Sequence, residues 1–297
     1  MRITNNIIVQ RQLAGLQSNL AAIDNAQGQV SSGKRVQVAS DDPAAASGIM
    51  TAATTLRAIQ QYKANVAGAT DRVNAEDSTF QQLTDLMTRA QEISVQEASA
   101  TASPATRQAA ALEAQGLLDS AVQLANTKFG DEYLFGGDNS TVAPFTVAGT
   151  GLAAAYTTTS AGGNRVVSIN DGQTMTISHT GTQAFVASGI LDSLAKLTGS
   201  LAGADVAGIN TANTQISGAF DNLQGLVGDT GARGNQLIMT SSTLDTVEGD
   251  VTSHKSDLQD VDAASAITEL TSRQAAYQAA LLAISKSANM SLTDYLK

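Results

Sequence analysis

The chain has 297 residues, of which 42% are hydrophobic but only 4% aromatic, and it contains neither Trp nor Cys. The lack of Cys excludes disulfides, thiolate catalysis and cysteine zinc sites. Asp and Glu outnumber Lys and Arg by 27 to 17, a formal charge of −10, which argues against general nucleic-acid binding because that needs a basic surface. Apolar residues that are mostly Ala, Leu, Val and Ile favour long helices packed along narrow seams over a compact enzyme core.

The opening segment, MRITNNIIVQRQL, lacks the long apolar stretch of a cleaved signal peptide. No part of the sequence approaches the roughly 18 consecutive apolar residues of a membrane-spanning helix. We therefore expect no membrane insertion, and export would have to use a route that needs no cleaved signal.

Apolar residues recur along the N-terminal segment at alternating spacings of four and three, interrupted once by Gln27. The C-terminal segment repeats this pattern with one interruption at Gln274. Such spacing predicts two amphipathic helices with one narrow apolar stripe each. Because neither helix is stable alone in water, we expect them to cover each other, together with copies from neighbouring subunits. The stripe residues are Val9, Leu13, Leu16, Leu20, Ile23 and Val30, then Ile267, Leu270, Tyr277, Leu281, Ile284 and Ala288.

The segment GQVSSGKR, which begins at Gly28, resembles a phosphate-binding P-loop with Arg35 in place of the required Ser or Thr. A P-loop follows a strand and opens a helix, whereas here a helix precedes the glycines and an extended stretch follows. We interpret the segment as a connector in which Gly33 ends the first helix and Asp42 caps a second helix beginning at Pro43. Lys34 and Arg35 are expected to face acidic groups of a neighbouring subunit.

Three further helical regions follow from the apolar spacing. The first runs from Pro43 to about Ala90, and the second begins at Pro104, behind a cap at Ser103, and continues towards Asn126. The third begins near Asp205 and continues to Val261. Within it, the glycines of GDTGARGNQ (228–236) predict a break or a loosened turn.

A region rich in Thr, Ser and Gly between about 138 and 188 predicts a small β module. Its clearest element is a hairpin in RVVSINDGQTMTIS. The loop could have two residues, Asp171 and Gly172, or three, beginning at Asn170 with Gly172 in the left-handed conformation. We prefer the three-residue loop because it buries more apolar surface. It places four residues on one face: Val167, Ile169, Met175 and Ile177.

No residue pattern indicates catalysis. His254 falls on the apolar seam of the last rod helix, so we expect it to be packed or partly exposed, and we expect His179, at the edge of the hairpin, to lie on the surface. Asp41 and Asp42 are better explained by a helix cap than by acid–base chemistry. We therefore predict no catalytic residues, no cofactor and no metal site.

The expected fold class is mainly α, an elongated helical bundle and coiled coil formed by the paired N- and C-terminal regions, with a small β-rich insert. We expect four parts. Residues 1–32 and 262–297 form a terminal coiled-coil domain, 33–42 form the connector, 43–137 and 192–261 form a helical rod, and 138–191 form the β-rich outer insert.

Four segments together resemble one family. They are MRIT at the start, VSSGKRVQVASDDPAAAS after the first helix, GDEYLFGG (130–137) followed by APF (143–145), and the C-terminal segment that begins at Ser256. They are similar to the hook–filament junction proteins of the bacterial flagellum, hook-associated proteins of the FlgL type within the flagellin superfamily. The resemblance covers most of the chain outside about 146–228.

The resemblance implies a structural, non-enzymatic protein that is secreted by the flagellar type III export apparatus, acts outside the cell, and is transiently cytoplasmic before export. It implies a ring of identical subunits, a hook-side hook-associated protein on one side, flagellin on the other, and an export chaperone on the C-terminal helix. The residues expected to make subunit or chaperone contacts are Val9, Leu13, Leu16, Leu20, Ile23, Val30, Lys34, Arg35, Ile267, Leu270, Tyr277, Leu281, Ile284 and Leu292.

Flagellin, the bulk filament subunit, is the alternative, because its termini share the same plan. Flagellins more usually carry Gly-Leu-Arg-Ile-like and Lys-Asp-Asp-Ala-Ala-Gly-like stretches where this chain has GKRV, from Gly33, and SDDPA, from Ser40. A nucleotide-hydrolysing enzyme is the third hypothesis, and it predicts ATP or GTP binding that depends on Lys34.

Overall fold

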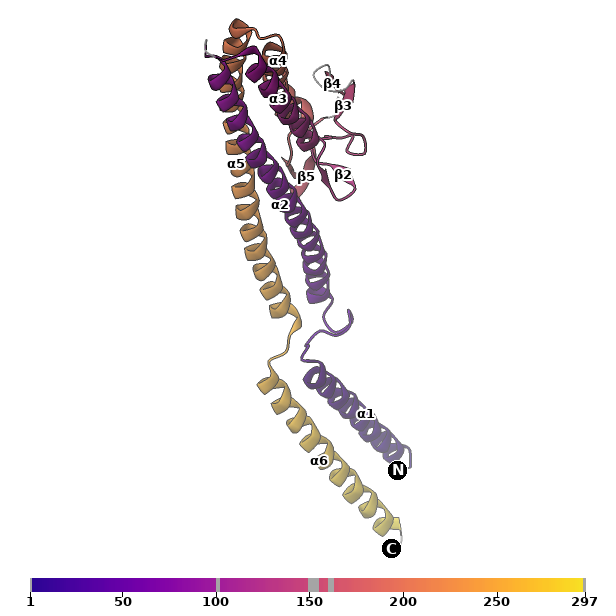
Figure 1. Cartoon of the computed structure of the whole chain (residues 1–297). Coiled ribbons are helices and arrows are strands. Elements are labelled where there is room, and N and C mark those ends of the chain that lie inside the picture. The colour runs from indigo at the N-terminus through magenta and orange to yellow at the C-terminus, as the bar shows by residue number, and fades with distance from the viewer. Residues whose placement is uncertain (1, 100–101, 149–154, 160–162, 296–297) are drawn as a thin grey trace. The chain divides into compact units, whose positions relative to one another are not determined.

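The computed structural model describes residues 2–99, 102–148, 155–159 and 163–295. The chain forms two compact units (Figure 1). The first, the terminal unit, comprises Met1–Ala58 and Val247–Lys297, and the second, the central unit, comprises Ile59–Thr246. The mainly α fold with small antiparallel strand pairs confirms the expected fold class.

Two antiparallel helices dominate the terminal unit, α1 (Arg2–Ser32) and α6 (Ala263–Tyr295), so that the start of α1 and the end of α6 lie at the same end of the pair (Figure 1). This confirms the pairing expected from the two apolar stripes. The unit also contains the first turns of α2 (Pro43–Glu97) and the last turns of α5 (Val206–Gln259).

The connector joins these helices through backbone hydrogen bonds. Gly33 ends α1 with a φ of +69°, a conformation that favours glycine, and its carbonyl accepts from the Val261 N–H at 3.0 Å. The Arg35 N–H donates to the Gln259 carbonyl at 2.7 Å. Asp42 caps α2, since its Oδ1 accepts from the Ala45 N–H at 3.0 Å. The predicted break at Gly33 and the predicted cap at Asp42 are both confirmed.

The central unit packs α2, α3 (Pro104–Ala125), α4 (Ile190–Ala202) and α5 around one apolar core. The predicted cap of α3 is confirmed, because the Ser103 hydroxyl accepts from the Thr106 N–H at 3.1 Å. The fully buried rings of Phe80, Phe135 and Phe185 join the helices to the non-helical segments, with centroids 5.7 Å and 5.0 Å apart along this series. Helix α4, which packs on α3, was not predicted as a separate helix.

The prediction of a break at 228–236 is wrong, because α5 continues without interruption through this segment. The reason lies in the burial pattern. Leu223, Thr230, Leu237 and Leu244 are buried at intervals of seven residues, so the seam against the rest of the unit continues through the glycines. Tertiary packing of this seam outweighs the intrinsic cost of about 1 kcal/mol for each helical glycine.

Within the described residues, three separate two-stranded antiparallel pairs accompany a π-helical segment, η2 (Thr182–Ala187). The pairs are β1 (Lys128–Phe129) with β2 (Glu132–Tyr133), β3 (Phe145–Ala148) with β4 (Ala155–Thr158), and β5 (Val166–Asn170) with β6 (Gln173–Thr176).

The β5–β6 hairpin follows the preferred register over Val166–Ser168, where Val167 pairs with Met175. Gly172 is left-handed, with a φ of +66°. Next to the turn, a bulge at Ile169 pairs Asn170 with Gln173, so the loop itself closes with two residues rather than three. Ile169 and Met175 are buried, as the preferred register predicts.

Candidate assembly surface and connector

The α1–α6 pair covers only one edge of each apolar stripe. On α1, Leu16 and Ile23 are half-buried, whereas Leu13 and Leu20 remain 55% and 44% exposed. On α6, Leu270, Tyr277 and Ile284 are half-buried. Ile267 and Leu281 are 51% and 44% exposed. The two helices therefore leave large apolar residues of both stripes exposed in the single chain.

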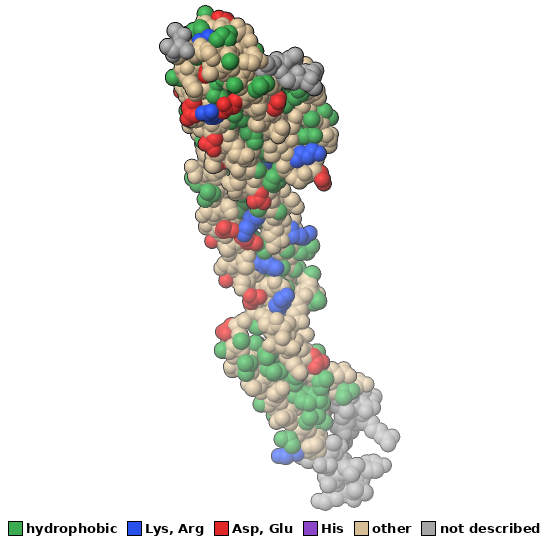
Figure 2. Space-filling view, viewed as in Figure 1, with side chains coloured by type: hydrophobic (Ala, Val, Ile, Leu, Met, Phe, Trp, Pro, Cys, Tyr) green, Lys and Arg blue, Asp and Glu red, His purple; other side chains and the backbone are tan. Residues whose placement is uncertain are grey.

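The structure thus brings some predicted contact residues together across the pair and leaves others uncovered. Val30 is exposed near the end of α1. The side chains of Val9, Ala288 and Leu292 lie outside the described part of the chain. Figure 2 shows hydrophobic side chains over the terminal helices with few charged groups among them. That these residues contact other subunits or a chaperone remains a prediction.

The connector carries an ion pair within the chain. The Arg35 guanidinium lies 3.1 Å from the Asp42 carboxylate and also donates to the Leu258 carbonyl at 2.8 Å. Arg35 therefore already has an acidic partner in its own chain, where the sequence suggested one in a neighbour. Lys34 is exposed, and its backbone forms an isolated β-bridge with Asp260.

Backbone donors hold the connector carboxylates in the ionised form. Hydrogen bonds from the Val38 and Gln37 N–H groups lower the pKa of Asp41. The Ala45 N–H, followed by Arg35, lowers the pKa of Asp42. Asp41 therefore holds the connector backbone and Asp42 caps α2, which supports the helix-cap interpretation over acid–base chemistry.

The segment that resembles a P-loop is mostly helical, a backbone conformation that cannot bind a phosphate group. Gly28 lies inside α1, and the helix continues to Ser32, so its N–H groups are used in intrahelical hydrogen bonds rather than facing a ligand. The next helix begins only at Pro43. The segment therefore matches a P-loop only in its glycine and lysine residues, because it lacks the strand–loop–helix order of a nucleotide site.

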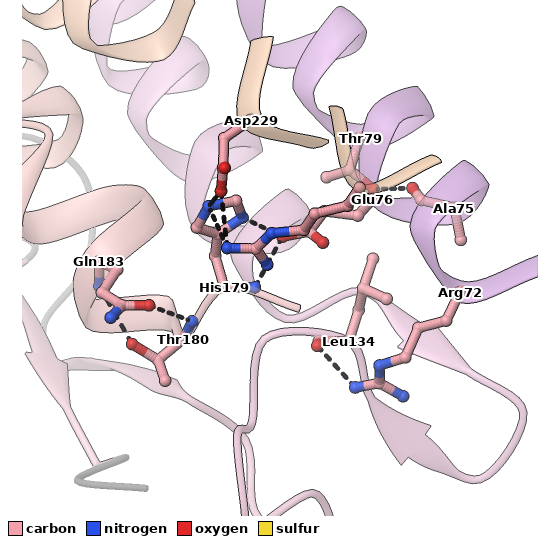
Figure 3. Close-up of polar contacts among 10 residues, drawn as sticks. Arg72, Ala75, Glu76, Thr79, Leu134, His179, Thr180, Gln183 and Asp229 are labelled. Atoms are coloured by element: carbon pink, nitrogen blue, oxygen red, sulfur yellow. Dashed lines mark hydrogen bonds and ion pairs between the residues drawn. The ribbon is translucent and has the colours of Figure 1, made fainter. Parts of the chain in front are cut away.

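Figure 3 shows a buried polar cluster that the sequence analysis missed. The His179 ring Nδ1 lies 2.8 Å from Glu76, which is 0% exposed, and its Nε2 lies 3.0 Å from Asp229 and 3.2 Å from Arg233. The His179 backbone N–H also donates to Glu76 at 2.9 Å. The expectation of a surface His179 is wrong, because this ring joins the segment after β6 to α2 and α5. His254 is exposed on α5 rather than packed in the seam.

A second ion cluster ties the β1–β2 pair to α2. The buried Arg72 guanidinium donates to the carbonyls of Tyr133 and Leu134 at 3.1 Å and 2.7 Å and lies 3.4 Å from Glu132. Glu132 also pairs with Arg165, which precedes β5. Burial, together with Arg165, lowers the pKa of Arg72. Each charged group of the two clusters has a partner within the central unit, so the clusters join the non-helical segments to α2 and α5.

No local pattern in the sequence could have revealed these clusters, because Glu76 and His179 are 103 residues apart and Arg72 and Leu134 are 62 apart. A single charged residue in an apolar helix seam, such as Glu76 between Val73 and Phe80, was the one available signal.

Comparison with known proteins agrees with this architecture. The models of the N-terminal and C-terminal helical regions of bacterial flagellin match residues 3–140 and 209–296. The chain belongs to the flagellin superfamily.

Two curated relatives are named for one particular member of this superfamily, flagellar hook-associated protein 3. The flagellar hook-associated protein 3 of Salmonella typhimurium is 32% identical over 188 residues, which cover 62% of this chain and 57% of the relative. That of Escherichia coli is 34% identical over 146 residues, which cover 49% and 46% of the two chains. The matches thus span about half the length of these relatives.

Two solved structures share the fold. A putative flagellar hook-associated protein from Vibrio parahaemolyticus has a TM-score of 0.66 at 19% identity, covering 74% of this chain and 100% of that one. Bacillus cereus FlgL has a TM-score of 0.58 at 21% identity, covering 69% and 99%. Among the described residues of this flagellin-superfamily chain, no helix has the length and apolar content needed to cross a membrane.

Proposed function

We propose that this chain is a structural adaptor of the bacterial flagellum that joins the hook side to the flagellin filament. Copies of the chain would form a ring in which the terminal helices pack against those of neighbouring copies. One face of the ring would contact a hook-side hook-associated protein and the other would contact flagellin. The resemblance of the connector and both chain ends to junction proteins, together with the relatives named hook-associated protein 3, supports this assignment.

The observation that carries the proposal is the uncovered half of the terminal stripes. Leu13 and Leu20 on α1, with Ile267 and Leu281 on α6, are large apolar residues exposed in the single chain. Burying them between copies is worth about 25 cal/mol per Å² of apolar surface before the ordering costs of assembly are subtracted. A helix pair whose remaining apolar edge faces water is suited to association with further helices of the same kind.

The same edge supports a transient partner before assembly. An export chaperone bound along α6, over the stripe Ile267–Ile284, would cover the residues that later face neighbouring subunits. Export through the flagellar type III apparatus would place the mature protein outside the cell in the flagellum, after a transient cytoplasmic stage. Terminal helices that depend on partners for stability suit a chain that travels unfolded.

We also propose that the protein is not an enzyme and needs no cofactor. The histidine nearest to acidic groups, His179, is held between the buried Glu76 and the exposed Asp229. The four-part division of the chain into terminal coiled coil, connector, rod and outer insert remains part of this proposal.

Deletion of the gene and complementation test the proposed function. Without the protein, cells should retain hooks but shed flagellin into the medium, and the wild-type chain should restore attached filaments. Normal filaments in the deletion strain would contradict an adaptor role.

Flagellin is the second candidate, because the matching family models describe the terminal regions of flagellin itself. Flagellin polymerises into long filaments, whereas a junction protein should not do so readily. Electron microscopy of the purified protein under polymerising conditions separates the two candidates, and long filaments would favour flagellin.

A further inference from the structure

Helix α1 is almost free of charge. Between Ile3 and Ser32 the sequence contains a single cation, Arg11, and a single anion, Asp24. Both side chains are exposed, and neither forms a hydrogen bond or ion pair with the described residues of its own chain. Two isolated and opposite charges in a stretch of 30 residues without any other charge are the kind of feature that fixes register between helices.

The two charges lie on different flanks of α1. One row of α1 is covered within the single chain: Leu16, Asn19 and Ile23 are half-buried and Ala26 is buried. At about 100° per residue, Arg11 lies roughly 100° to one side of this row and Asp24 roughly 120° to the other. The exposed Leu13 and Leu20 share the flank of Asp24. One symmetric contact between two copies therefore cannot use both charges on both helices.

Opposite flanks instead suit a heterologous contact, in which one surface of a copy meets a different surface of the next. The two charges are 13 positions apart in sequence, or roughly 20 Å along the helix at about 1.5 Å per residue. Arg11 of one copy can reach Asp24 of a parallel neighbour only when the two helices are offset by roughly this distance.

The surroundings of Asp24 favour a cation. Asp24 lines a recess of about 390 Å³ with Gly28 of α1 and the connector residues Arg35, Asp41 and Asp42. The Asp41 and Asp42 carboxylates accept backbone N–H groups, and Arg35 pairs with Asp42. Three carboxylates against one guanidinium leave the recess negative, and Asp24 is the one of them without a partner among the described residues.

The other cations on the terminal helices whose side chains the structure describes are weaker candidates. Arg273 on α6 already pairs with Glu269 at 3.0 Å. Lys286 is exposed on α6, but an ammonium is a point charge, whereas the guanidinium of Arg11 can bind a carboxylate through two parallel hydrogen bonds.

We propose that Arg11 of one copy pairs with Asp24 of the next, and that this pair sets the direction and the axial offset of neighbouring α1 helices. The inference rests on the proposed assembly through the terminal helices. Leu13 and Leu20 contribute apolar burial on the same flank, and the charge pair rejects registers in which Asp24 would meet uncharged surface.

Charge reversal and its rescue test the pair in cells that lack the native gene. Four full-length chains are compared: wild type, Arg11→Glu, Asp24→Arg and the double variant. Each single reversal should lower the number of attached filaments roughly tenfold, because like charges meet at every contact, and the double variant should restore it. High salt should weaken the defect of the single variants, since the charges are exposed. Lys286→Glu is the matched control and should behave as wild type.

The possible results distinguish failure of the Arg11–Asp24 pair from failure of the proposed adaptor function. If the wild-type chain restores filaments but both single reversals work equally well, the register pair is overturned while the adaptor function stands. Failure of the double variant, with helicity unchanged by circular dichroism, also overturns the pair. Rescue of Asp24→Arg by Lys286→Glu instead of Arg11→Glu would overturn the assignment of Arg11. Normal filaments in the deletion strain would contradict the proposed function itself.

Discussion

The Arg35 guanidinium lies 3.1 Å from the carboxylate of Asp42, the residue that caps α2. The same guanidinium donates to the Leu258 carbonyl at the end of α5 at 2.8 Å. One side chain therefore joins the start of one helix to the end of another: its positive charge complements the C-terminal end of α5 and pairs with the carboxylate that caps α2. These two interactions of Arg35 hold the connector between α1 and α2 in place.

Removal of the Arg35 side chain, which contacts both Asp42 and the Leu258 carbonyl, should loosen the connector. We expect limited proteolysis within residues 33–42 to be faster in Arg35→Ala than in wild type, and Arg35→Lys should be intermediate because an ammonium lacks the fork geometry. Arg57→Ala is the control, since the hydrogen bonds of Arg57 lie within α2. Equal cleavage rates in Arg35→Ala and wild type would contradict this role of Arg35.

Acid should loosen the same segment. Backbone donors lower the pKa of Asp42 below its ordinary value of 3.8, so its ionised form stabilises the fold. This stabilisation is complete above the unfolded pKa and is lost as the pH falls through the lower, folded pKa. Amide hydrogen exchange at the start of α2, corrected for intrinsic rates, should therefore rise below about pH 4. In Asp42→Asn, which caps without titrating, this rise should be smaller, and an identical pH profile would contradict the assignment.

The His179 cluster should be a major contributor to the stability of the central unit. His179→Ala removes the ring partner of a fully buried Glu76 carboxylate, so we expect the free energy of unfolding to fall by about 3 kcal/mol. Urea denaturation provides the measurement. His254→Ala, at the exposed histidine of α5, is the matched control and should change stability by less than about 0.5 kcal/mol. Equal effects of the two substitutions would show that the buried cluster is not important.

Because α5 is continuous, replacing one of its exposed glycines with Ala should stabilise the protein. Gly231 is exposed within the helix, and an added Cβ would meet no atom within 4 Å, so Gly231→Ala should stabilise the protein by about 1 kcal/mol. At Gly208 the Cβ would lie 2.4 Å from Asp205 and 2.5 Å from Ser200, so Gly208→Ala should give no gain. A loss of stability in Gly231→Ala would indicate that the helix is broken there after all.

A charge on the exposed edge of α6 should block assembly without unfolding the central unit. Leu281 is 44% exposed in the single chain, so Leu281→Asp should preserve the thermal transition of the central unit while preventing incorporation or chaperone binding. Gln278→Asp adds the same charge at an exposed polar position of α6 and should be tolerated. Normal filaments with Leu281→Asp would count against burial of this edge.

The sequence was sufficient wherever local chemistry decides the structure. Heptad spacing predicted α1 and α6, and Asp42 and Ser103 predicted the starts of α2 and α3, because a cap needs only neighbours in sequence. The left-handed Gly172 belongs to the same group, because a tight turn imposes its own backbone conformation.

The features that the sequence did not predict depend on distant partners. The glycines around Gly231 suggested a break, but the buried Thr230 continues a seam that is visible only once α5 packs against the core. His179 seemed to belong to the surface because its partners, Glu76 and Asp229, lie 103 and 50 residues away. The exposed half of the terminal stripes was likewise beyond sequence reasoning, since the spacing shows which residues are apolar but not how many helices cover them.

Immunogold labelling of flagella with an antibody against the central unit tests the central claim most directly. The adaptor role predicts one narrow band of gold at the base of the filament, next to the hook. Gold distributed along the whole filament would contradict it and identify the chain as a filament subunit.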